Sequence, residues 1–428
     1  MANDLLRRDF MKQTGAAALL AAPAVQSARG ANDKVSIGWI GLGTRGYFCM
    51  DAMYKGNAKN VHVGAVCDTF TGHLARGKDR VQTNEGAAPK TFNDYREILA
   101  DKSIDTVFIM TPEHLHYPMM MAALKAGKNV YVEKPLAHTI EQGAELVKAA
   151  QKSGKVVQVG TQNRSSTLYK RAKEMYEQGM LGEVHYVRAF WYRNSAPDNP
   201  AWRYAIPPEA NEQNSDWDKF LGPAPKRPFD LHRYYQWRLY WDYSGGISTD
   251  LLVHQTDIVN FVCGKTVPSS CMASGGIYRW TSPDDDRDVP DTLSAIYDYP
   301  DRFHINYSCY FGNDQYGYGE QFCGTEGTLE VLNRQDLHFY PQTLKGAASE
   351  AVKARKEVHI NGPKDLGEAD GVINHIRNFI EAVRGNEKVI APPTAGQQAA
   401  ISGHMATLSF KSNKKVYWDT KTEKVRYS

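Results

Sequence analysis

Residues 35–46, VSIGWIGLGTRG, decide the fold of the first half of the chain. An apolar run with the character of a β-strand leads into Gly41, Gly43 and Gly46, which follow the G-x-G-x-x-G spacing. The first glycine permits a tight strand-to-helix turn, the second lets the backbone approach a pyrophosphate, and the third lets the helix pack closely on the sheet. The stretch therefore predicts a Rossmann turn that opens a helix and binds a dinucleotide.

The strand that follows ends in an acidic residue. Residues 61–67, VHVGAVC, form a second apolar run, and Asp68 comes 22 residues after Gly46. An acid at this position can accept hydrogen bonds from the ribose hydroxyls of a dinucleotide. Because no arginine stands next to Asp68 to receive a 2′-phosphate, we expect NAD rather than NADP. The alternative interpretation is that Asp68 only caps its strand.

Apolar strands and helical segments continue to alternate. TVFIM at 106–110 and VYVE at 130–133 read as buried strands on either side of a helical segment at 119–129. This alternation predicts a doubly wound parallel sheet, and such sheets bind ligands at the carboxyl ends of their strands. The residues expected at that edge are Thr111, Pro112, His114, His116, Glu133, Lys134 and Pro135.

Several further motifs resemble those of one enzyme family. They are TPEHLHYP at 111–118, ALKAGKNVYVEKPLA at 123–137, GTQNRSS at 160–166, EQGMLGEV at 177–184, DKFLGPAP at 218–225 and YSGGISTDLLVHQTDIV at 243–259. With GLGTRG, they make the chain similar to the glucose-fructose oxidoreductase/inositol dehydrogenase (Gfo/Idh/MocA) family, whose hallmark is an E-K-P turn after the fifth strand. The resemblance covers essentially the whole mature chain. We therefore expect an NAD-binding Rossmann domain at 34–160 and a substrate-binding and oligomerisation domain of α+β type at 161–428.

The cofactor pocket is expected to draw on several of these segments. No third ligand is suitably spaced near His114 and His116, so we expect no metal and assign His116 to the pocket wall. The set expected to bind NAD is Gly41, Gly43, Thr44, Arg45, Gly46, Asp68, Thr111, Pro112, His116, Glu133, Lys134 and Gln162.

After about residue 165 the pattern changes to short strands. GEVHYVRAFWYR at 182–193, TLSAIYDY at 292–299 and FHINYSCYF at 303–311 are rich in strand-forming residues and are joined by short turns. This pattern predicts an open, mainly antiparallel sheet. The family resemblance implies that helices cover one face and that the other face commonly meets a second subunit, so we expect a homo-oligomer formed through this sheet.

The candidate catalytic residues come from both halves. Asp250 and His254 stand four residues apart, and the resemblance implies a helix here, which would put both on one face. By the same resemblance they work with Lys134 of the E-K-P turn around the reacting carbon. A histidine can take the hydroxyl proton during hydride transfer from a carbinol, Lys134 can polarise the oxygen, and Asp250 can orient it or the imidazole. Asp257, one turn beyond His254, is expected to face outward or to act as a cap.

The segment 191–243 is rich in tryptophan, tyrosine and arginine. Such a mixture suits a carbohydrate site, because sugar C–H faces pack on aromatic rings while guanidinium groups bind hydroxyls, but it also suits a loop-rich core. The substrate-binding candidates are Arg238, Tyr240 and Trp241, which precede the segment of Asp250. Tyr316 and Tyr318, in a glycine-rich loop, are weaker candidates.

The first residues read as an export signal. Arg7 and Arg8 precede a run of small apolar residues at 15–25, the order typical of a twin-arginine signal, and we expect a signal peptide at 1–31. The run is too short to cross a bilayer, and no other segment is long and apolar enough. We therefore expect a mature chain without a membrane span in the periplasm or outside the cell.

Charge and cysteine content limit the classes of ligand that this chain is expected to bind. The net charge is +3 and like charges form no run, which excludes a nucleic-acid binder. The six cysteines show no CxxC pair or metal spacing and read as buried thiols.

An exported enzyme would find no free pool of NAD outside the inner membrane. The twin-arginine route carries folded proteins, so we expect the protein to be exported with tightly bound NAD that is reduced and reoxidised within one catalytic cycle. We favour a sugar oxidoreductase of this kind. The alternative is an NAD-dependent glycosidase, because glycosidases that act on α-N-acetylgalactosaminides also resemble this family. A third interpretation is a nucleotide- or sugar-binding protein without catalysis.

Overall fold

The computed structural model describes residues 34–428 apart from 197, 282–284, 343–353 and 369–370. The predicted signal peptide lies outside the described residues. Within the described part of the chain, no helix is long and apolar enough to cross a membrane. All six cysteines are described, none forms a disulfide, and five are buried.

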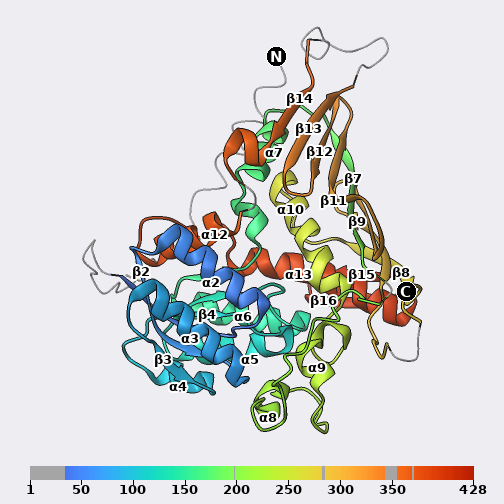
Figure 1. Ribbon diagram of the computed structural model, residues 1–428. Helices are drawn as coiled ribbons and strands as arrows, with labels where there is room; N and C mark the ends of the chain where they lie inside the picture. Colours follow the sequence, from blue (N-terminus) through green and yellow to red (C-terminus); the bar gives the residue numbers. More distant parts are fainter. Residues whose placement is uncertain (1–33, 197, 282–284, 343–353, 369–370) are drawn as a thin grey trace. The chain divides into compact units, whose positions relative to one another are not determined.

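The first half of the described chain forms a six-stranded parallel sheet in the order β3-β2-β1-β4-β5-β6 (Figure 1). Its strands are β1 (Val35–Ile40), β2 (Val61–Cys67), β3 (Lys90–Phe92), β4 (Thr106–Ile109), β5 (Asn129–Val132) and β6 (Val157–Val159). The connecting helices are α2 (Thr44–Asn57), α3 (Thr71–Glu85), α4 (Tyr95–Ala100), α5 (Glu113–Lys125) and α6 (Ile140–Ser153). The prediction of a doubly wound parallel sheet is confirmed.

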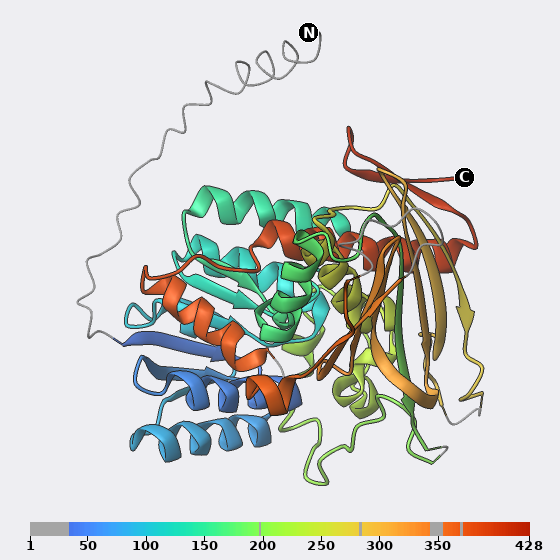
Figure 2. The same cartoon turned by 90° about the horizontal axis from the view of Figure 1, so that it is seen from above.

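One face of this sheet is completed by a helix from much later in the chain. α12 (Val372–Val383) places Phe379 in the same apolar cluster as Trp39 of β1 and Phe108 of β4. The ring of Phe108 lies 4.5 Å from that of Trp39 and 5.4 Å from that of Phe379, measured between centroids. Figure 2 shows α12, in orange, beside the blue helix α2, which it contacts. The apolar core of the nucleotide-binding half thus includes side chains far beyond residue 160.

The second half forms a ten-stranded sheet in the order β14-β13-β12-β11-β7-β10-β9-β8-β15-β16. Only the pair β7 and β10 is parallel. The predicted open, mainly antiparallel sheet is confirmed. The strands are β7 (Val184–Asn194), β8 (Ser270–Gly276), β9 (Thr292–Tyr299), β10 (Phe303–Tyr310), β11 (Gly312–Gly324), β12 (Gly327–Leu332), β13 (Asp336–Pro341), β14 (Val358–Asn361), β15 (Val416–Asp419) and β16 (Lys424–Tyr427).

Long helices gather on one face of this sheet, as the family resemblance implies (Figures 1 and 2). They are α7 (Thr167–Glu177), α10 (Val253–Cys263) and α13 (Pro393–Ser412). Strand residues alternate between the two faces, so Leu293 and Tyr297 of β9 are buried in the core while Ile296 is exposed on the other face. The loop region between β7 and α10 carries only short helices, α8 (Trp217–Leu221), α9 (Leu231–Tyr235), η2 (Trp237–Leu239) and the π-helical turn η3 (Ser248–Leu252).

Two local predictions are wrong. Asp257 does not face outward: it is fully buried, and both of its carboxylate oxygens accept hydrogen bonds from Nε of Arg164, at 2.8 and 2.9 Å. The reason is that α10 is covered by α7, α13 and the sheet, so almost every residue of the helix is interior. Tyr316 and Tyr318 lie within strand β11 rather than in a loop.

Candidate active site

A cavity of about 1040 Å³ opens where the carboxyl ends of β1, β2, β4 and β5 face the second half of the chain. This edge holds the point where the strand order reverses between β1 and β4, which is the usual ligand position in doubly wound sheets. The volume lies at the upper end of the roughly 300–1,000 Å³ typical of ligand pockets. The two halves of the chain therefore share one large site.

The three glycines of the turn have different structural reasons to be glycine. Gly41 has a φ of +93°, and a Cβ there would lie 2.7 Å from the carbonyl oxygen of Met110. A Cβ on Gly46 would overlap the carbonyl oxygen of Gly41. A Cβ on Gly43, by contrast, would meet nothing closer than His73 Cε1 at 3.9 Å. Gly43 lines the cavity at the start of α2, so the open space above it fits a pyrophosphate.

Asp68 lies at the carboxyl end of β2 and lines the same cavity. Its Oδ2 accepts a hydrogen bond from the Leu42 backbone N–H at 2.7 Å, and its Oδ1 accepts one from Phe70 N–H at 2.9 Å. The side chain thus caps the local backbone. Because a carboxylate offers roughly four acceptor positions, this capping leaves capacity for ribose hydroxyls.

The E-K-P turn after β5 is held from within. Glu133 is buried, and its Oε1 accepts a hydrogen bond from Arg45 Nε at 2.8 Å, while its Oε2 accepts one from the backbone N–H of Lys134 at 3.2 Å. Burial opposes ionisation of Glu133, but the charges of Arg45 and Lys134 outweigh it and lower the pKa of this carboxyl. Glu133 is therefore ionised, and its carboxylate stabilises the turn that carries Lys134 by binding both Arg45 and the backbone of that turn.

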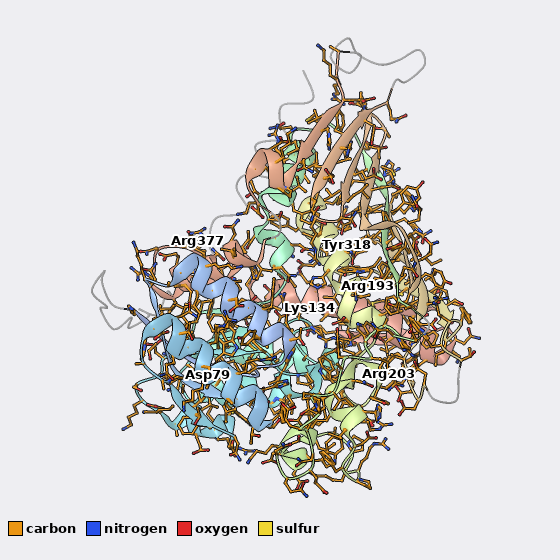
Figure 3. The ribbon with its side chains drawn as sticks, viewed as in Figure 1. Asp79, Lys134, Arg193, Arg203, Tyr318 and Arg377 are labelled. Atoms are coloured by element: carbon orange, nitrogen blue, oxygen red, sulfur yellow. The ribbon has the colours of Figure 1, made fainter. Side chains whose placement is uncertain are left out.

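Lys134, which Figure 3 labels, lines the cavity. Its Nζ donates to the carbonyl oxygen of Asp250 at 2.7 Å and to Oδ1 of Asp250 at 3.0 Å. Arg238 Nε donates to the same Oδ1 at 3.3 Å. Burial opposes ionisation of Asp250, yet Lys134 and Arg238 together hold its pKa far below the ordinary value. The structure thus brings Lys134 and Asp250 into direct contact across 116 residues of sequence.

His254 lies in the first turn of α10 and lines the cavity with Asp250. Its side chain is buried, and Nδ1 has no hydrogen-bond partner among the described residues. Burial is the main reason that the pKa of His254 lies well below its ordinary value, and the nearby charges of Lys134 and Arg334 lower it further. The imidazole is therefore neutral near pH 7 and able to accept a proton.

One positioning residue was missed by the sequence analysis. Glu113 starts α5 and is buried, and it accepts hydrogen bonds from Ser244 Oγ at 3.0 Å, Gly245 N–H at 3.1 Å and Thr249 Oγ1 at 2.7 Å. It thereby ties the segment just before Asp250 to the nucleotide-binding half. Glu113 belongs to the TPEHLHYP motif, but its partners lie more than 130 residues away.

Most of the predicted site residues share the cavity wall. Those that line it are Gly41, Gly43, Thr44, Arg45, Asp68, Thr111, Pro112, His116, Glu133, Lys134, Gln162, Arg238, Asp250 and His254. Gly46 packs beneath the turn instead. Among the other wall residues without an assigned role are Trp191, Arg193 and Arg334.

The prediction that Tyr240 and Trp241 bind substrate is corrected, because neither residue lines the cavity. Tyr240 is fully buried, and its hydroxyl donates to Asp286. The ring of Trp241 packs on Lys411, whose Nζ lies 3.9 Å from the ring centroid. Nearness to Asp250 in sequence did not translate into nearness to the site, because the chain turns away after Arg238.

Two family models match the chain. That of the oxidoreductase family, NAD-binding Rossmann fold, matches residues 35–161, and that of the oxidoreductase family, C-terminal alpha/beta domain, matches residues 223–417. The chain therefore belongs to the Gfo/Idh/MocA oxidoreductase family, as its motifs predicted, and its cofactor is NAD.

Curated proteins similar to this chain include a dehydrogenase and a glycosyl hydrolase family protein. The chain is 24% identical over 391 residues to scyllo-inositol 2-dehydrogenase (NAD(+)) of Bacillus subtilis (strain 168), covering 89% of this chain and 96% of that protein. A glycosyl hydrolase family 109 protein of Shewanella baltica (strain OS155) is 29% identical over 207 residues, or 42% of this chain and 45% of that protein. The match to the Shewanella protein and to several other curated relatives covers less than half of the relative's own length.

A solved structure with the same fold is levoglucosan dehydrogenase in complex with NADH and levoglucosan. It has a TM-score of 0.68 and 19% identity, and the match covers 90% of this chain and 99% of that one.

Proposed function

We propose that this protein is an NAD-dependent oxidoreductase that transfers hydride at a carbinol carbon of a sugar or sugar derivative. One observation carries the proposal: a Lys134–Asp250 contact and a buried, neutral His254 line the same cavity as the glycine turn. Membership of the oxidoreductase family supports the same conclusion.

The residues of the chain divide the chemistry between them. NAD supplies the hydride acceptor when bound. His254 can take the proton of a substrate hydroxyl because its imidazole is neutral and has an open nitrogen. An ammonium has three donors, and Lys134 directs two of them to Asp250, so the third can stabilise negative charge on the substrate oxygen. Asp250 fixes the direction of this ammonium.

A second candidate function is an NAD-dependent glycosidase. In that reaction, transient oxidation of a sugar makes a glycosidic bond open to elimination, and the hydride is returned after water has added. The similarity to a glycosyl hydrolase family 109 protein favours it. Release of the alcohol from an aryl glycoside without an acceptor sugar would establish hydrolysis.

We extend the proposal to location and assembly. The twin-arginine order at Arg7 and Arg8 supports export of the folded protein with NAD already bound and recycled within each turnover. The outer face of the ten-stranded sheet exposes Tyr186, Ile296 and Tyr310, which supports a homo-oligomer through that face.

The first experiment is to denature the mature protein, purified without added cofactor, and to quantify the released nucleotide by mass spectrometry. Near-stoichiometric NAD or NADH supports a retained cofactor, whereas protein free of nucleotide contradicts it. A panel of sugars and polyols is then added to the NAD-loaded protein, and nicotinamide reduction is followed by absorbance. Reduction that disappears in Lys134→Ala supports the oxidoreductase.

A further inference from the structure

Two arginines line the same cavity without having been assigned a contact with the substrate. Arg193 lies on β7, and Arg334 lies in the turn between β12 and β13. The guanidinium carbon of each lies 5.2 Å from the ring centroid of Trp191. The Trp191 ring is itself 5.8 Å from that of His254, so both charges flank the aromatic ring that lies beside the proposed proton acceptor. Figure 3 labels Arg193 and Lys134, and both line the cavity.

Neither arginine forms a direct ion pair with a carboxylate among the described residues, although the charge of Arg193 helps to lower the pKa of Asp250 and the charge of Arg334 opposes the rise that burial causes in the pKa of Glu320. Among the described residues, no hydrogen bond or ion pair joins Arg193 or Arg334 to a carboxylate, and Nε and Nη2 of Arg334 are buried without a partner. Asp250 accepts from Lys134 and Arg238 instead, and the buried carboxyl of Glu320 accepts from the hydroxyl of Tyr169 at 2.7 Å. A guanidinium is always charged, and its burial is costly unless it is paired. The geometry leaves two guanidinium groups without a directly paired carboxylate.

The phosphates of the cofactor are not expected to pair with these two arginines. They are expected at the glycine turn, where Arg45 lies at the start of α2. Arg193 and Arg334 come instead from the second half of the chain and flank the aromatic wall formed by Trp191 and Tyr318, whose rings stack at 4.5 Å. The missing anion therefore belongs to the substrate.

We propose that the substrate is a sugar bearing an oxyanion, a carboxylate or a phosphate, that pairs with Arg193 and Arg334. This proposal rests on the proposed function and narrows its substrate class. Guanidinium groups bind oxyanions through parallel N–H···O bonds, which also orient the ligand. A neutral sugar leaves both guanidinium groups unpaired, so the site discriminates against it.

The test compares matched ligands on NAD-loaded protein. The affinities of D-glucose, D-glucuronate and phosphorylated D-glucose, and of D-galactose and D-galacturonate, are measured by isothermal titration, and nicotinamide reduction is recorded for each. We expect at least one oxyanion to bind about tenfold or more tightly than its neutral counterpart. Comparison of the affinities of the uronates with that of phosphorylated D-glucose shows whether the site prefers a carboxylate or a phosphate.

Variants tie the preference to the arginines. Arg334→Met should reduce the oxyanion preference, which is the ratio of the affinities for an anionic sugar and its neutral counterpart, to within about twofold. Arg188→Met is the matched control, because Arg188 is also on β7, has its guanidinium 5.2 Å from the ring of Phe190 and lies outside the cavity wall. That control should retain the full preference.

The outcomes separate the two proposals. Equal binding of neutral and anionic sugars, or a preference that survives in Arg334→Met, overturns the oxyanion proposal even if a neutral sugar reduces NAD. An Arg334-dependent preference without nicotinamide reduction by any sugar supports the oxyanion site and contradicts the oxidoreductase.

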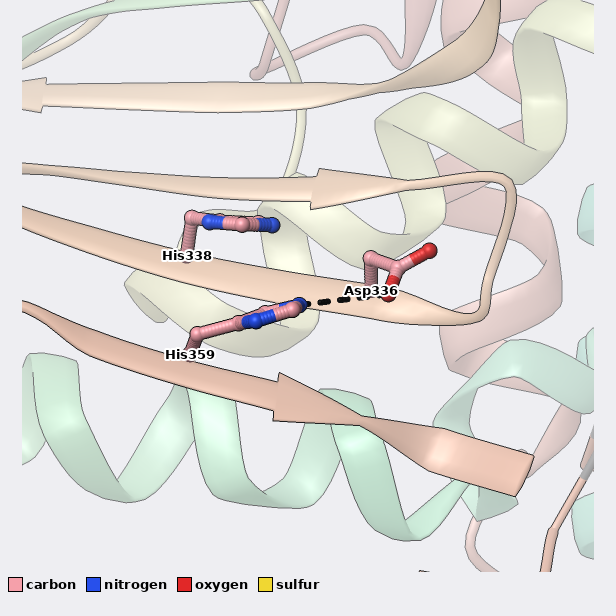
Figure 4. Close-up of side chains that lie close together, drawn as sticks. All are labelled: Asp336, His338 and His359. Atoms are coloured by element: carbon pink, nitrogen blue, oxygen red, sulfur yellow. Dashed lines mark hydrogen bonds and ion pairs between the residues drawn. The ribbon is translucent and has the colours of Figure 1, made fainter. Parts of the chain in front are cut away.

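A second inference comes from a different observation, on the outer face of the ten-stranded sheet. Asp336 and His338 are two residues apart on β13 and so share a face, and His359 on β14 is the register partner of His338. Figure 4 shows the three side chains gathered on the two strands. His359 Nε2 lies 3.3 Å from Asp336 Oδ1, and the two imidazole rings stack at 3.9 Å. Candidate ligand atoms of the three residues all lie within 4.8 Å of one another.

We propose that Asp336, His338 and His359 bind a divalent transition-metal ion such as Zn²⁺. Two imidazoles and one carboxylate are ligands that Zn²⁺ accepts at roughly 2.0–2.2 Å, and small rotamer changes can bring these atoms to one centre. The ion would join β14 to β13 at the end of the sheet, because β14 pairs with no other strand among the described residues.

The test uses the full mature chain without a histidine tag, titrated with Zn²⁺ by calorimetry. We expect one Zn²⁺ per chain, bound about tenfold or more weakly in His338→Ala and His359→Ala. His304→Ala is the control, because His304 contacts Asp298 at 3.0 Å on the same sheet without a second imidazole in that pair. Equal loss in the control, or no loss in either variant, overturns the site.

Discussion

Gly43 and Gly46 stand three residues apart in one turn, but the structure gives them opposite reasons to be glycine. A Cβ on Gly46 would overlap the backbone carbonyl of Gly41, which cannot move without opening the turn. A Cβ on Gly43 would enter open space, with its nearest protein atom 3.9 Å away. The same substitution, glycine to alanine, should therefore damage folding at one position and cofactor binding at the other.

The magnitudes follow from these contacts. Overpacking against backbone costs about 3 kcal/mol or more, so Gly46→Ala should lower the thermal midpoint by several degrees. At Gly43 the backbone φ of −63° is ordinary for alanine, and the stability should stay within about 1 kcal/mol of the parent. Its methyl group would lie where we place the pyrophosphate, so NAD affinity should fall about 10–100-fold, or about 1.4–2.8 kcal/mol.

The assay pairs thermal unfolding of the nucleotide-free protein with calorimetric titration of NAD. Gly43→Ala should melt like the parent and bind NAD weakly, whereas Gly46→Ala should melt early. Parent-like NAD affinity in a well-folded Gly43→Ala protein would place the pyrophosphate elsewhere. A parent-like midpoint in Gly46→Ala would refute the packing argument.

Three further predictions test other parts of the structure. Lys134→Ala should reduce turnover by about 10²–10⁴ while NAD remains bound, and activity within tenfold of the parent would remove Lys134 from the chemistry. Asp257→Ala should cost about 3–5 kcal/mol in urea unfolding, because it leaves Arg164 buried without its carboxylate; a loss under 1 kcal/mol would contradict a buried pair. Burial lowers the pKa of His114 to about 3 and that of His404 to about 4. Since the unfolded value is about 6.5, the unfolded chain binds more protons at lower pH. The stability conferred by the neutral rings is therefore present above pH 6.5 and lost as the pH falls, by about 2 kcal/mol for each ring at pH 5. A thermal midpoint that stays constant between pH 6.5 and 5 would contradict this account.

The site residues that could be predicted from the sequence are those that belong to short motifs of consecutive residues. The turn at Gly41, Gly43 and Gly46 and the E-K-P turn at Lys134 are local signals, because a strand end and the helix after it are neighbours in both sequence and space. The fold class followed from the same local alternation of strands and helices.

Residues that meet through the second sheet gave no comparable signal. Arg193 and Arg334 are brought to one ring only by the packing of β7 and the β12–β13 turn, and His338 meets His359 only through strand register. Asp257 was misread for another reason: face arguments assume that a helix has a solvent side, and α10 has almost none.

The position of α12 has a consequence for how this architecture can be divided. Trp39 and Phe108, at the heart of the first sheet, are covered by Phe379 from near the end of the chain. A fragment that stops near residue 160 would expose this aromatic surface to solvent and would therefore be prone to self-association. The cofactor-binding half is therefore not a portable module, and any recombination that exchanges it between relatives must carry the distant helix along with it.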